Sequence, residues 1–508
     1  SKIGGGVAIN LSKLRARGEA IKGIEGVAKG VLPVAKALEG GFGYADQLGQ
    51  RPGAGAVYLN IFHYDLPEFL DTKKVNADED IRLATISTGL VVPSKFFDLA
   101  KNNDPFYLFA PHTVEREYGQ SLDDMNLDEM YDELVANDKV KKREMDAREM
   151  LNTIAQTQLQ SGYPYIMFKD NANKVHPLKD IGQIKISNLC TEIFQLQETS
   201  TINDYGTDDE IRRDISCNLG SLNIANVMES GKVRDSVHDG IEALTVVSDD
   251  TAIANAPGVK KANDELHSVG LGAMNLHGYL AKNKISYESE EARDFANVFF
   301  MLLNFYSLEK SMLIAKERGE TFKDFDKSEY ATGKYFERYI SEAVEPKSEK
   351  VAGLFSNIHI PSQQDWEALR DEVMENGLFH AYRLAIAPTQ SISYVQNATS
   401  SVMPIVDTIE RRTYGNSETF YPMPFLSPET MWYYKSAFNT DQMKLLDMIA
   451  TIQQHIDQGI STILYVNSDI STRELARLYI YAHHKGLKSL YYTRNKLLSV
   501  EECTSCSV

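Results

Sequence analysis

The chain has 508 residues, with 53 Lys and Arg against 71 Asp and Glu, and a formal net charge of −18. This acidic balance argues against non-specific binding to a nucleic-acid polymer, because the protein's field repels a polyanion. With 43% hydrophobic and 10% aromatic residues, the composition is globular and excludes disorder over most of the chain. The sequence contains no run of about 18 apolar residues, so no membrane span is expected, and the first residues do not form a signal peptide.

Glycines and other turn residues divide the chain into short segments with strand or helix periodicity. We expect strands at 56–62, 84–92, 163–168, 184–190, 462–466 and 487–492, and helices at 128–160, 290–318 and 472–484. Strands that alternate with helices favour parallel βα units in an α/β fold, of which a barrel is one form. The last sixteen residues, 493–508, end in small and polar residues and are expected to form a mobile tail.

The segment from Ser187 to Glu192 carries an amide, a thiol and a carboxylate at Asn188, Cys190 and Glu192. On an extended segment, residues two apart project to the same side. Together these groups could hold hydroxyls, react at sulfur and move a proton. The alternative is a buried and unreactive Cys, which is common for this residue type. Cys217 is open to the same two interpretations.

The chain has only four cysteines, too few for the disulfide framework of an extracellular protein, so a reducing cytoplasm is favoured. Two of them, Cys503 and Cys506, form a Cys-x-x-Cys pair close to the end of the chain. The eleven residues from Thr493 to Cys503 would let the dithiol travel roughly 35 Å, which favours a redox carrier over a structural disulfide. A zinc site would need Cys190 and Cys217 as further ligands, and no second Cys-x-x-Cys supports it.

Three further motifs allow functional interpretations. Tyr491 and Tyr492 follow an apolar strand; adjacent tyrosines usually divide between core and surface, and the functional alternative is stepwise radical transfer through two phenols. The glycine-rich loop 49–55 lacks the Lys-Ser/Thr of a phosphate-binding Walker A loop, although Arg51 could contact an anion. Residues 388–393 place three hydroxyls and backbone donors in a tight turn, which favours phosphate binding.

Taken in order, these motifs resemble the large catalytic subunit of class I ribonucleotide reductase, most closely its class Ib form. The resemblance covers essentially the whole chain and includes residues 188–192, 216–223, 388–393, 490–492 and 503–506. It implies a ten-stranded α/β barrel of two parallel five-stranded halves over residues 1–492, truncated at the N-terminus, and a flexible redox tail at 493–508. The implied activity is thiyl-radical reduction of ribonucleoside diphosphates to 2′-deoxyribonucleoside diphosphates in the cytoplasm, for DNA synthesis.

The resemblance also assigns roles around one sugar ring, with Cys190 on a loop inside the barrel. Cys190 would carry the transient thiyl radical that abstracts the ribose 3′ hydrogen. Glu192 would take the proton of the 3′-hydroxyl, and Asn188 would orient the ribose hydroxyls. Cys217 would be one half of the dithiol that reduces C2′ as water leaves.

The remaining catalytic roles point to partners. Tyr491 and Tyr492 would relay the radical from a metal-containing small subunit, and this chain itself would bind no metal or cofactor. Cys503 and Cys506 would reduce the spent active-site disulfide and then be reduced by a glutaredoxin- or thioredoxin-like protein. A homodimer is implied, and no binding to a nucleic-acid polymer or to a membrane.

Two nucleotide sites are implied as well. Substrate contacts are expected from Gly5, Gly6, Ser187, Asn188, Pro388, Thr389, Gln390, Ser391 and Ile392. An effector deoxynucleoside triphosphate is expected to contact Arg15, Lys22, Gln47 and Arg51. Members of the family have Gly where this chain has Gln390, and Gln would be strained there if the turn requires a positive φ.

The family carries the thiol partner of Cys217 upstream of the motif Gly4-Gly5-Gly6, together with an N-terminal helical region. We therefore expect this chain to be the C-terminal portion of the subunit and to need a separate or spliced N-terminal portion. Ser1 is a residue type allowed immediately after an intein, which is consistent with a split or interrupted gene. The alternative function is a non-catalytic fragment that binds nucleotide, effector or the small subunit.

Overall fold

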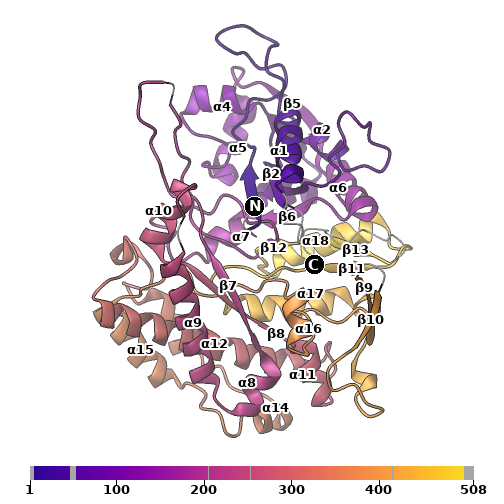
Figure 1. Ribbon diagram of the computed structural model, residues 1–508. Coiled ribbons are helices and arrows are strands. Elements are labelled where there is room, and N and C mark those ends of the chain that lie inside the picture. The colour runs from indigo at the N-terminus through magenta and orange to yellow at the C-terminus, as the bar shows by residue number, and fades with distance from the viewer. Residues whose placement is uncertain (1–4, 46–52, 204, 252, 415–416, 497–508) are drawn as a thin grey trace. The chain divides into compact units, whose positions relative to one another are not determined.

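The computed structural model describes residues 5–45, 53–203, 205–251, 253–414 and 417–496 (Figure 1). The chain forms two compact units, each assembled from segments that are distant in the sequence. Unit 1 comprises Ser1–Ala172, Lys185–Thr191 and Thr462–Val508. Unit 2 comprises Asn173–Ile184 and Glu192–Ser461. The two units are described separately below.

Unit 1 contains a five-stranded sheet in the order β1-β2-β3-β6-β12. Its strands are β1 (Val7–Asn10), β2 (Gly55–Asn60), β3 (Ser87–Val92), β6 (Tyr165–Phe168) and β12 (Ser489–Leu490). The first four strands are parallel neighbours, and β12 pairs antiparallel with β6. Every residue of β2, β3 and β6 is buried, which is typical of a parallel sheet covered on both faces. The expectation of an all-parallel half is therefore wrong at β12.

Two smaller sheets and a set of helices complete unit 1. Strand β4 (Pro105–Phe109) pairs antiparallel with β5 (Lys142–Asp146), and β11 (Leu464–Val466) pairs parallel with β13 (Thr493–Asn495). The helices are α1 (Leu32–Tyr44), α2 (Leu66–Asp71), α3 (Ser94–Asn102), α4 (Pro111–Tyr118), α5 (Leu127–Ala136), α6 (Ala147–Ser161), α7 (Lys169–Lys174), which extends past the end of the unit, and α18 (Thr472–His484).

The single helix expected at 128–160 is two helices, α5 and α6, separated by β5. Helix α5 ends where Asn137 adopts an extended backbone. Helix α6 begins anew at Asp146, whose side chain accepts a hydrogen bond from the Glu149 N–H at 2.8 Å. An Asp that caps a helix satisfies an otherwise unpaired amide. The charged stretch between the two helices forms β5, which pairs with β4. The first three residues of the expected tail, Thr493–Asn495, form strand β13.

Unit 2 contains two parallel strands, β7 (Asn218–Asn223) and β8 (Val269–Met274). Parallel bridges continue this array from Leu271 to Leu384 and from Ile386 to Ile460. The Gly459 N–H then donates to the Glu192 carbonyl at 2.8 Å. Five extended segments, two of them regular strands, thus follow one another across unit 2.

Helices make up most of the rest of unit 2, with an antiparallel pair, β9 (Ile409–Tyr414) and β10 (Ser417–Pro422). The helices are α8 (Ile224–Ser230), α9 (Val233–Asp250), α10 (Pro257–Leu266), α11 (Leu276–Lys282), α12 (Glu290–Arg318), α13 (Glu337–Ser341), α14 (Glu349–Leu354), α15 (Gln363–Asn376), α16 (Gln390–Val395) and α17 (Gln442–Gln453). Short 3-10 turns occur at Phe325–Lys327, Lys334–Phe336, Met431–Tyr433 and Ala437–Asn439.

Helix α12 is the central helix of unit 2 and has the predicted bounds (Figure 1). It begins at the N-cap Ser289, whose side chain accepts from the Ala292 N–H, and ends at Gly319 in the left-handed conformation. It packs against α9, α15 and α17. Among the described residues it alone has the length and apolar composition of a membrane-spanning helix, but 83% of its most apolar window is buried inside the protein. These contacts identify α12 as a core helix.

A fully buried ion pair lies beside the extended segments of unit 2. Arg383 and Asp457 are 3.2 Å apart, and both side chains are 0% exposed. Asp457 also accepts from the backbone N–H groups of Arg383 and Leu384, each at 2.9 Å. Arg383 donates further to Ser307 Oγ at 2.6 Å and to the Tyr330 hydroxyl at 3.2 Å. Because water reaches neither charge, each depends on the other for compensation.

Replacing Asp457 with Asn should leave the Arg383 guanidinium buried without a counter-charge. We expect a loss of about 3–5 kcal/mol in the free energy of unfolding, measured by denaturant-induced unfolding followed by circular dichroism. The matched control is Glu429→Gln, which neutralises the acidic partner of the exposed pair Lys284–Glu429 and should leave the free energy of unfolding almost unchanged. Equal losses for the two variants would contradict the prediction.

Candidate functional site

Cys190 lies in a turn of unit 1, so the strand expected at 184–190 does not form. Residues 182–188 have no regular secondary structure, and Leu189 and Cys190 form a turn. The next residue, Thr191, has φ +66°, a left-handed conformation that a β-branched residue rarely adopts. The side-chain alternation of an extended strand therefore does not apply between Cys190 and Glu192.

Thr191 is held in this conformation by its surroundings. It is fully buried, and its Oγ1 has no hydrogen-bond partner among the described residues. Its carbonyl oxygen accepts a hydrogen bond from Ser489 Oγ at 2.8 Å. Left-handed backbone costs an L-residue about 1–2 kcal/mol, and such strain often occurs at functional sites. The turn that carries Cys190 is thus maintained against a local preference.

The pair of variants Thr191→Gly and Thr191→Ala measures this strain. Both remove the hydroxyl and the methyl group, but only Gly also removes the Cβ that disfavours positive φ. We expect Thr191→Gly to be more stable than Thr191→Ala by about 0.5–1 kcal/mol, the backbone strain relieved minus the greater entropy of unfolded Gly. Denaturant unfolding of the two variants measures the difference, and an Ala variant that is the more stable would rule out strain at this residue.

The thiol of Cys190 is in direct contact with a phenol. The Tyr491 hydroxyl donates to Cys190 Sγ at 3.4 Å, and Tyr491 is only 1% exposed. The ring of Tyr492 lies 4.7 Å from that of Tyr491, at an interplanar angle of 65°. A thiol and two phenols in succession can pass an electron over short steps, with a proton moving along the O–H···S contact. Both tyrosines were predicted from the sequence.

Tyr165 is part of the same cluster and was missed by the sequence analysis. Its ring lies 4.7 Å from that of Tyr491, and it is fully buried. Its hydroxyl donates to Ser87 Oγ at 3.1 Å. Tyr165 lies in a predicted strand, but nothing in the sequence indicated that this strand would place its ring against a residue more than 300 positions away.

The residues that precede Cys190 are fixed by contacts within unit 1. The carbonyl oxygen of Asn188 accepts from the Tyr58 hydroxyl at 2.8 Å, and Ser187 Oγ donates to Asn188 Oδ1 at 3.4 Å. Gly6 packs against this segment so closely that a Cβ on it would lie 2.9 Å from Leu189 Cδ2. The structure therefore brings Gly6 against the Cys190 segment, where a side chain would not fit. The contact of Gly6 with substrate stays a prediction.

Glu192 is the first residue of a segment of unit 2 and is 1% exposed. Its Oε2 accepts from Ser461 Oγ at 2.9 Å, and its backbone carbonyl accepts from the Gly459 N–H. A buried carboxylate with a positioned donor can accept and release a proton at a defined place. Ser461 was not predicted, because no spacing in the sequence connects it to Glu192.

Cys217 belongs to the same unit and is partly buried. Its Sγ lies 3.8 Å from Gln458 Nε2 and 3.8 Å from the Asn218 carbonyl oxygen. Burial raises the pKa of the Cys217 thiol well above its ordinary value, and the negative charges of Glu192 and Asp457 raise it further. Cys217 and Glu192 are thus close enough to interact electrostatically, and the thiol is held in its protonated form.

The predicted phosphate turn lies at the start of the short helix α16. Thr389 precedes this helix and is buried; its Oγ1 contacts Ser393 Oγ at 3.1 Å and accepts from the Ser401 N–H at 2.7 Å. Ser391 and Ile392 are exposed, and Pro388 is partly exposed.

Gln390 is the first residue of α16 and is not among the residues with positive φ. The strain expected for Gln in place of Gly is therefore not found, because helical backbone suits any L-residue at this position.

The predicted effector residues are described only in part. Arg15 and Lys22 are both exposed on the connection between β1 and α1, and Lys22 has φ +52°.

Gly5, which was predicted to contact the substrate, is exposed, with open space where a Cβ would lie. Gln47, Arg51, Cys503 and Cys506 lie outside the described residues.

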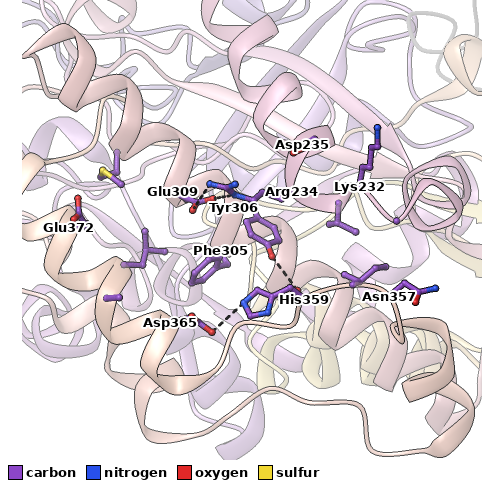
Figure 2. A pocket seen from close by; sticks show the side chains of 16 residues that line it. Lys232, Arg234, Asp235, Phe305, Tyr306, Glu309, Asn357, His359, Asp365 and Glu372 are labelled. Carbon is purple, nitrogen blue, oxygen red and sulfur yellow. Dashed lines mark hydrogen bonds and ion pairs between the residues drawn. The ribbon is translucent and has the colours of Figure 1, made fainter.

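A cavity of about 640 Å³ in unit 2 is formed by α9, α12, α15 and residues 357–359 (Figure 2). Arg234 pairs with Glu309 at 2.8 Å, and His359 pairs with Asp365 at 3.4 Å. None of the predicted site residues lines this cavity.

Within the described ranges, no group of three or more His, Cys, Asp or Glu side chains is arranged to hold a metal ion.

Comparison with known proteins gives consistent matches over the chain. Residues 1–493 match the model of a family described as "Ribonucleotide reductase, barrel domain". The chain is 55% identical to the ribonucleoside-diphosphate reductase subunit alpha of Bacillus subtilis (strain 168), covering all of this chain and 73% of that relative. It is 42% identical to the subunit alpha of Mycoplasma genitalium, covering 100% and 72% of the two chains. Identity to the NrdEB subunit alpha of Bacillus subtilis is 31%, with coverage of 100% and 82%.

Proposed function

The chain belongs to the ribonucleotide reductase family, and we propose that it reduces ribonucleoside diphosphates to 2′-deoxyribonucleoside diphosphates through a thiyl radical on Cys190. The observation that carries this proposal is the hydrogen bond from the Tyr491 hydroxyl to Cys190 Sγ. A phenoxyl radical on Tyr491 can take an electron and a proton from the thiol across this contact. That step regenerates the phenol and leaves the unpaired electron on sulfur.

The thiyl radical then removes the hydrogen atom from C3′ of the ribose, and Cys190 returns to the thiol. Glu192, oriented by Ser461, takes the proton of the 3′-hydroxyl, and Asn188 orients the sugar hydroxyls. The 2′-hydroxyl leaves as water. Two thiols, Cys217 and one from the N-terminal portion of the subunit, supply two electrons and two protons and become a disulfide. Cys190 finally returns its hydrogen atom to C3′, and the radical returns to Tyr491.

The burial of these groups supports radical chemistry. Tyr491 and Glu192 are each 1% exposed, and Thr191 between the thiol and the carboxylate is fully buried. Exclusion of water protects a reactive intermediate from side reactions. In the same proposal, residues 388–392 and Gly5 and Gly6 contact the substrate, and Arg15, Lys22, Gln47 and Arg51 contact a deoxynucleoside triphosphate effector.

The finer fold and the partners belong to this proposal too. The five-stranded sheet of unit 1 and the five extended segments of unit 2 support a ten-stranded barrel made of two halves. A metal-containing small subunit would deliver the radical by way of Tyr492 and Tyr491. The dithiol of Cys503 and Cys506, itself reduced by a glutaredoxin- or thioredoxin-like protein, would reduce the Cys217 disulfide. We assign the protein to the cytoplasm, as a homodimer.

The experiment is turnover of CDP by this chain, supplied with the small subunit, a dithiol reductant and the N-terminal portion of the subunit. We expect Tyr491→Phe to abolish dCDP formation, because the ring still packs against Tyr165 but the O–H that contacts sulfur is lost. The control is Tyr479→Phe, a buried phenol of the same unit whose hydroxyl donates to Gln158 Oε1 at 2.6 Å. It should cost about 1 kcal/mol of stability and leave turnover intact.

Activity of Tyr491→Phe near that of the unaltered chain would refute the radical route. Failure of the unaltered chain to form dCDP under these conditions, with binding of nucleotide or small subunit retained, would favour the non-catalytic binding fragment instead.

A further inference from the structure

The segment Asp457-Gln458-Gly459-Ile460-Ser461 contacts both functional side chains that the proposed function places in unit 2. Ser461 holds the Glu192 carboxylate, and Gln458 contacts the Cys217 sulfur. Gly459 lies so close to its neighbours that a Cβ would be 2.4 Å from the Phe194 ring. None of these five residues stands out in the sequence as a motif.

Gln458 is fully buried, and its side-chain amide has a defined orientation. Its Oε1 accepts from Gln195 Nε2 at 3.1 Å. Its Nε2 donates to the Val269 carbonyl oxygen at 3.0 Å and lies 3.8 Å from Cys217 Sγ, an ordinary N–H···S separation. Since the oxygen is fixed by a donor and the nitrogen by an acceptor, a flipped amide would lose both bonds. The second N–H of the amide is thus directed at the sulfur.

The backbone of Gln458 is fixed as firmly as its side chain. Its N–H donates to Asp457 Oδ1 at 2.9 Å and to the Leu384 carbonyl at 3.2 Å. Asp457 is itself held by the buried charge of Arg383. Position 458 therefore has little freedom to move away from the sulfur.

The charges around Cys217 oppose formation of a thiolate. Glu192 and Asp457 are the acidic groups that act on it, and the Gln458 amide is the neighbouring group that lowers its pKa. Exchange between a disulfide and a thiol requires a thiolate to leave. A buried sulfur on which two carboxylates act is therefore a poor leaving group, unless a hydrogen-bond donor compensates the negative charge that develops on it.

We propose that Gln458 is a positioning residue, which fixes the Cys217 sulfur and stabilises it as the leaving thiolate when the active-site disulfide is reduced. A thiolate of the carrier dithiol attacks the partner sulfur of Cys217, and the S–S bond breaks. Cys217 leaves with the bonding electron pair and then takes up the proton that the attacking thiol gave up. The second carrier thiol then attacks the first carrier sulfur and displaces the partner thiol, which takes up the released proton, so that the carrier is oxidised to a disulfide and the active-site pair is reduced. This inference rests on the proposed function.

The test is the pH dependence of Cys217 modification, which requires no turnover. The whole chain is treated with methyl methanethiosulfonate from pH 6 to 10.5, and labelling of the peptide that contains Cys217 is followed by mass spectrometry. In Gln458→Met, which keeps the shape but lacks the N–H, we expect the rate at pH 8 to fall about tenfold, because a hydrogen bond to a charged group is lost. The profile should move to higher pH by about one unit.

Two controls separate this role from general damage to the fold. Cys190 in the same samples belongs to unit 1 and should keep its profile. Tyr287→Phe removes another buried donor of unit 2, whose hydroxyl donates to the Val402 carbonyl oxygen at 2.8 Å, and should change the Cys217 rate by less than twofold. If Gln458→Met does not fold, Gln458→Asn retracts the amide by one methylene and should slow Cys217 severalfold.

A Cys217 profile within twofold of the unaltered chain in a folded Gln458 variant would overturn the proposal, as would an equal shift in Tyr287→Phe. The outcome is independent of catalysis. A shifted profile in a chain that forms no dCDP would leave the contact of Gln458 with the Cys217 sulfur standing and would refute the proposed function, and with it the role in disulfide reduction. Normal turnover with an unshifted profile would refute this assignment alone.

Discussion

The buried ion pair of Arg383 and Asp457 organises unit 2. Its carboxylate binds the backbone N–H groups of Arg383 and Leu384 on one extended segment and that of Gln458 on the next. The pair thereby sets the start of the segment that reaches Cys217 and, through Ser461, Glu192. A buried charge pair is rarely the most stable choice for a core, since apolar side chains of equal volume often perform as well. Here it supplies directional bonds to backbone groups, which apolar packing cannot do.

Unit 1 places a phenol at contact distance from the sulfur of Cys190. The parallel strands β3 and β6 bring Tyr165 into the core, and Tyr491 lies on its ring directly after β12. The turn at Cys190 then directs Sγ to the Tyr491 hydroxyl. Thr191, in its left-handed conformation, completes that turn. Strain is tolerated where a catalytic group must face a given direction, since the surrounding packing outweighs it.

Much of this could be predicted from the sequence, and the reasons for success and failure are physical. Helices α12 and α18 match their predicted bounds, because a Ser cap and an apolar periodicity mark each of them locally. Cys190 and Tyr491 were predicted as site residues from the motifs at 188–192 and 490–492. Ser461 and Gln458 were missed, since their importance depends on long-range pairing between extended segments. The strand expected at 184–190 failed because its apolar residues are buried without joining a sheet.

The parallel pairing of β13 with β11 has a consequence for the end of the chain. It fixes the backbone as far as Asn495, two residues beyond the point where free movement was expected to begin. Eight peptide units connect Asn495 to Cys503, so covalent geometry keeps the Cα of Cys503 within roughly 26 Å of the Cα of Asn495. The disulfide that we propose Cys503 reduces must therefore come within that distance, plus the length of one Cys side chain, of the end of β13.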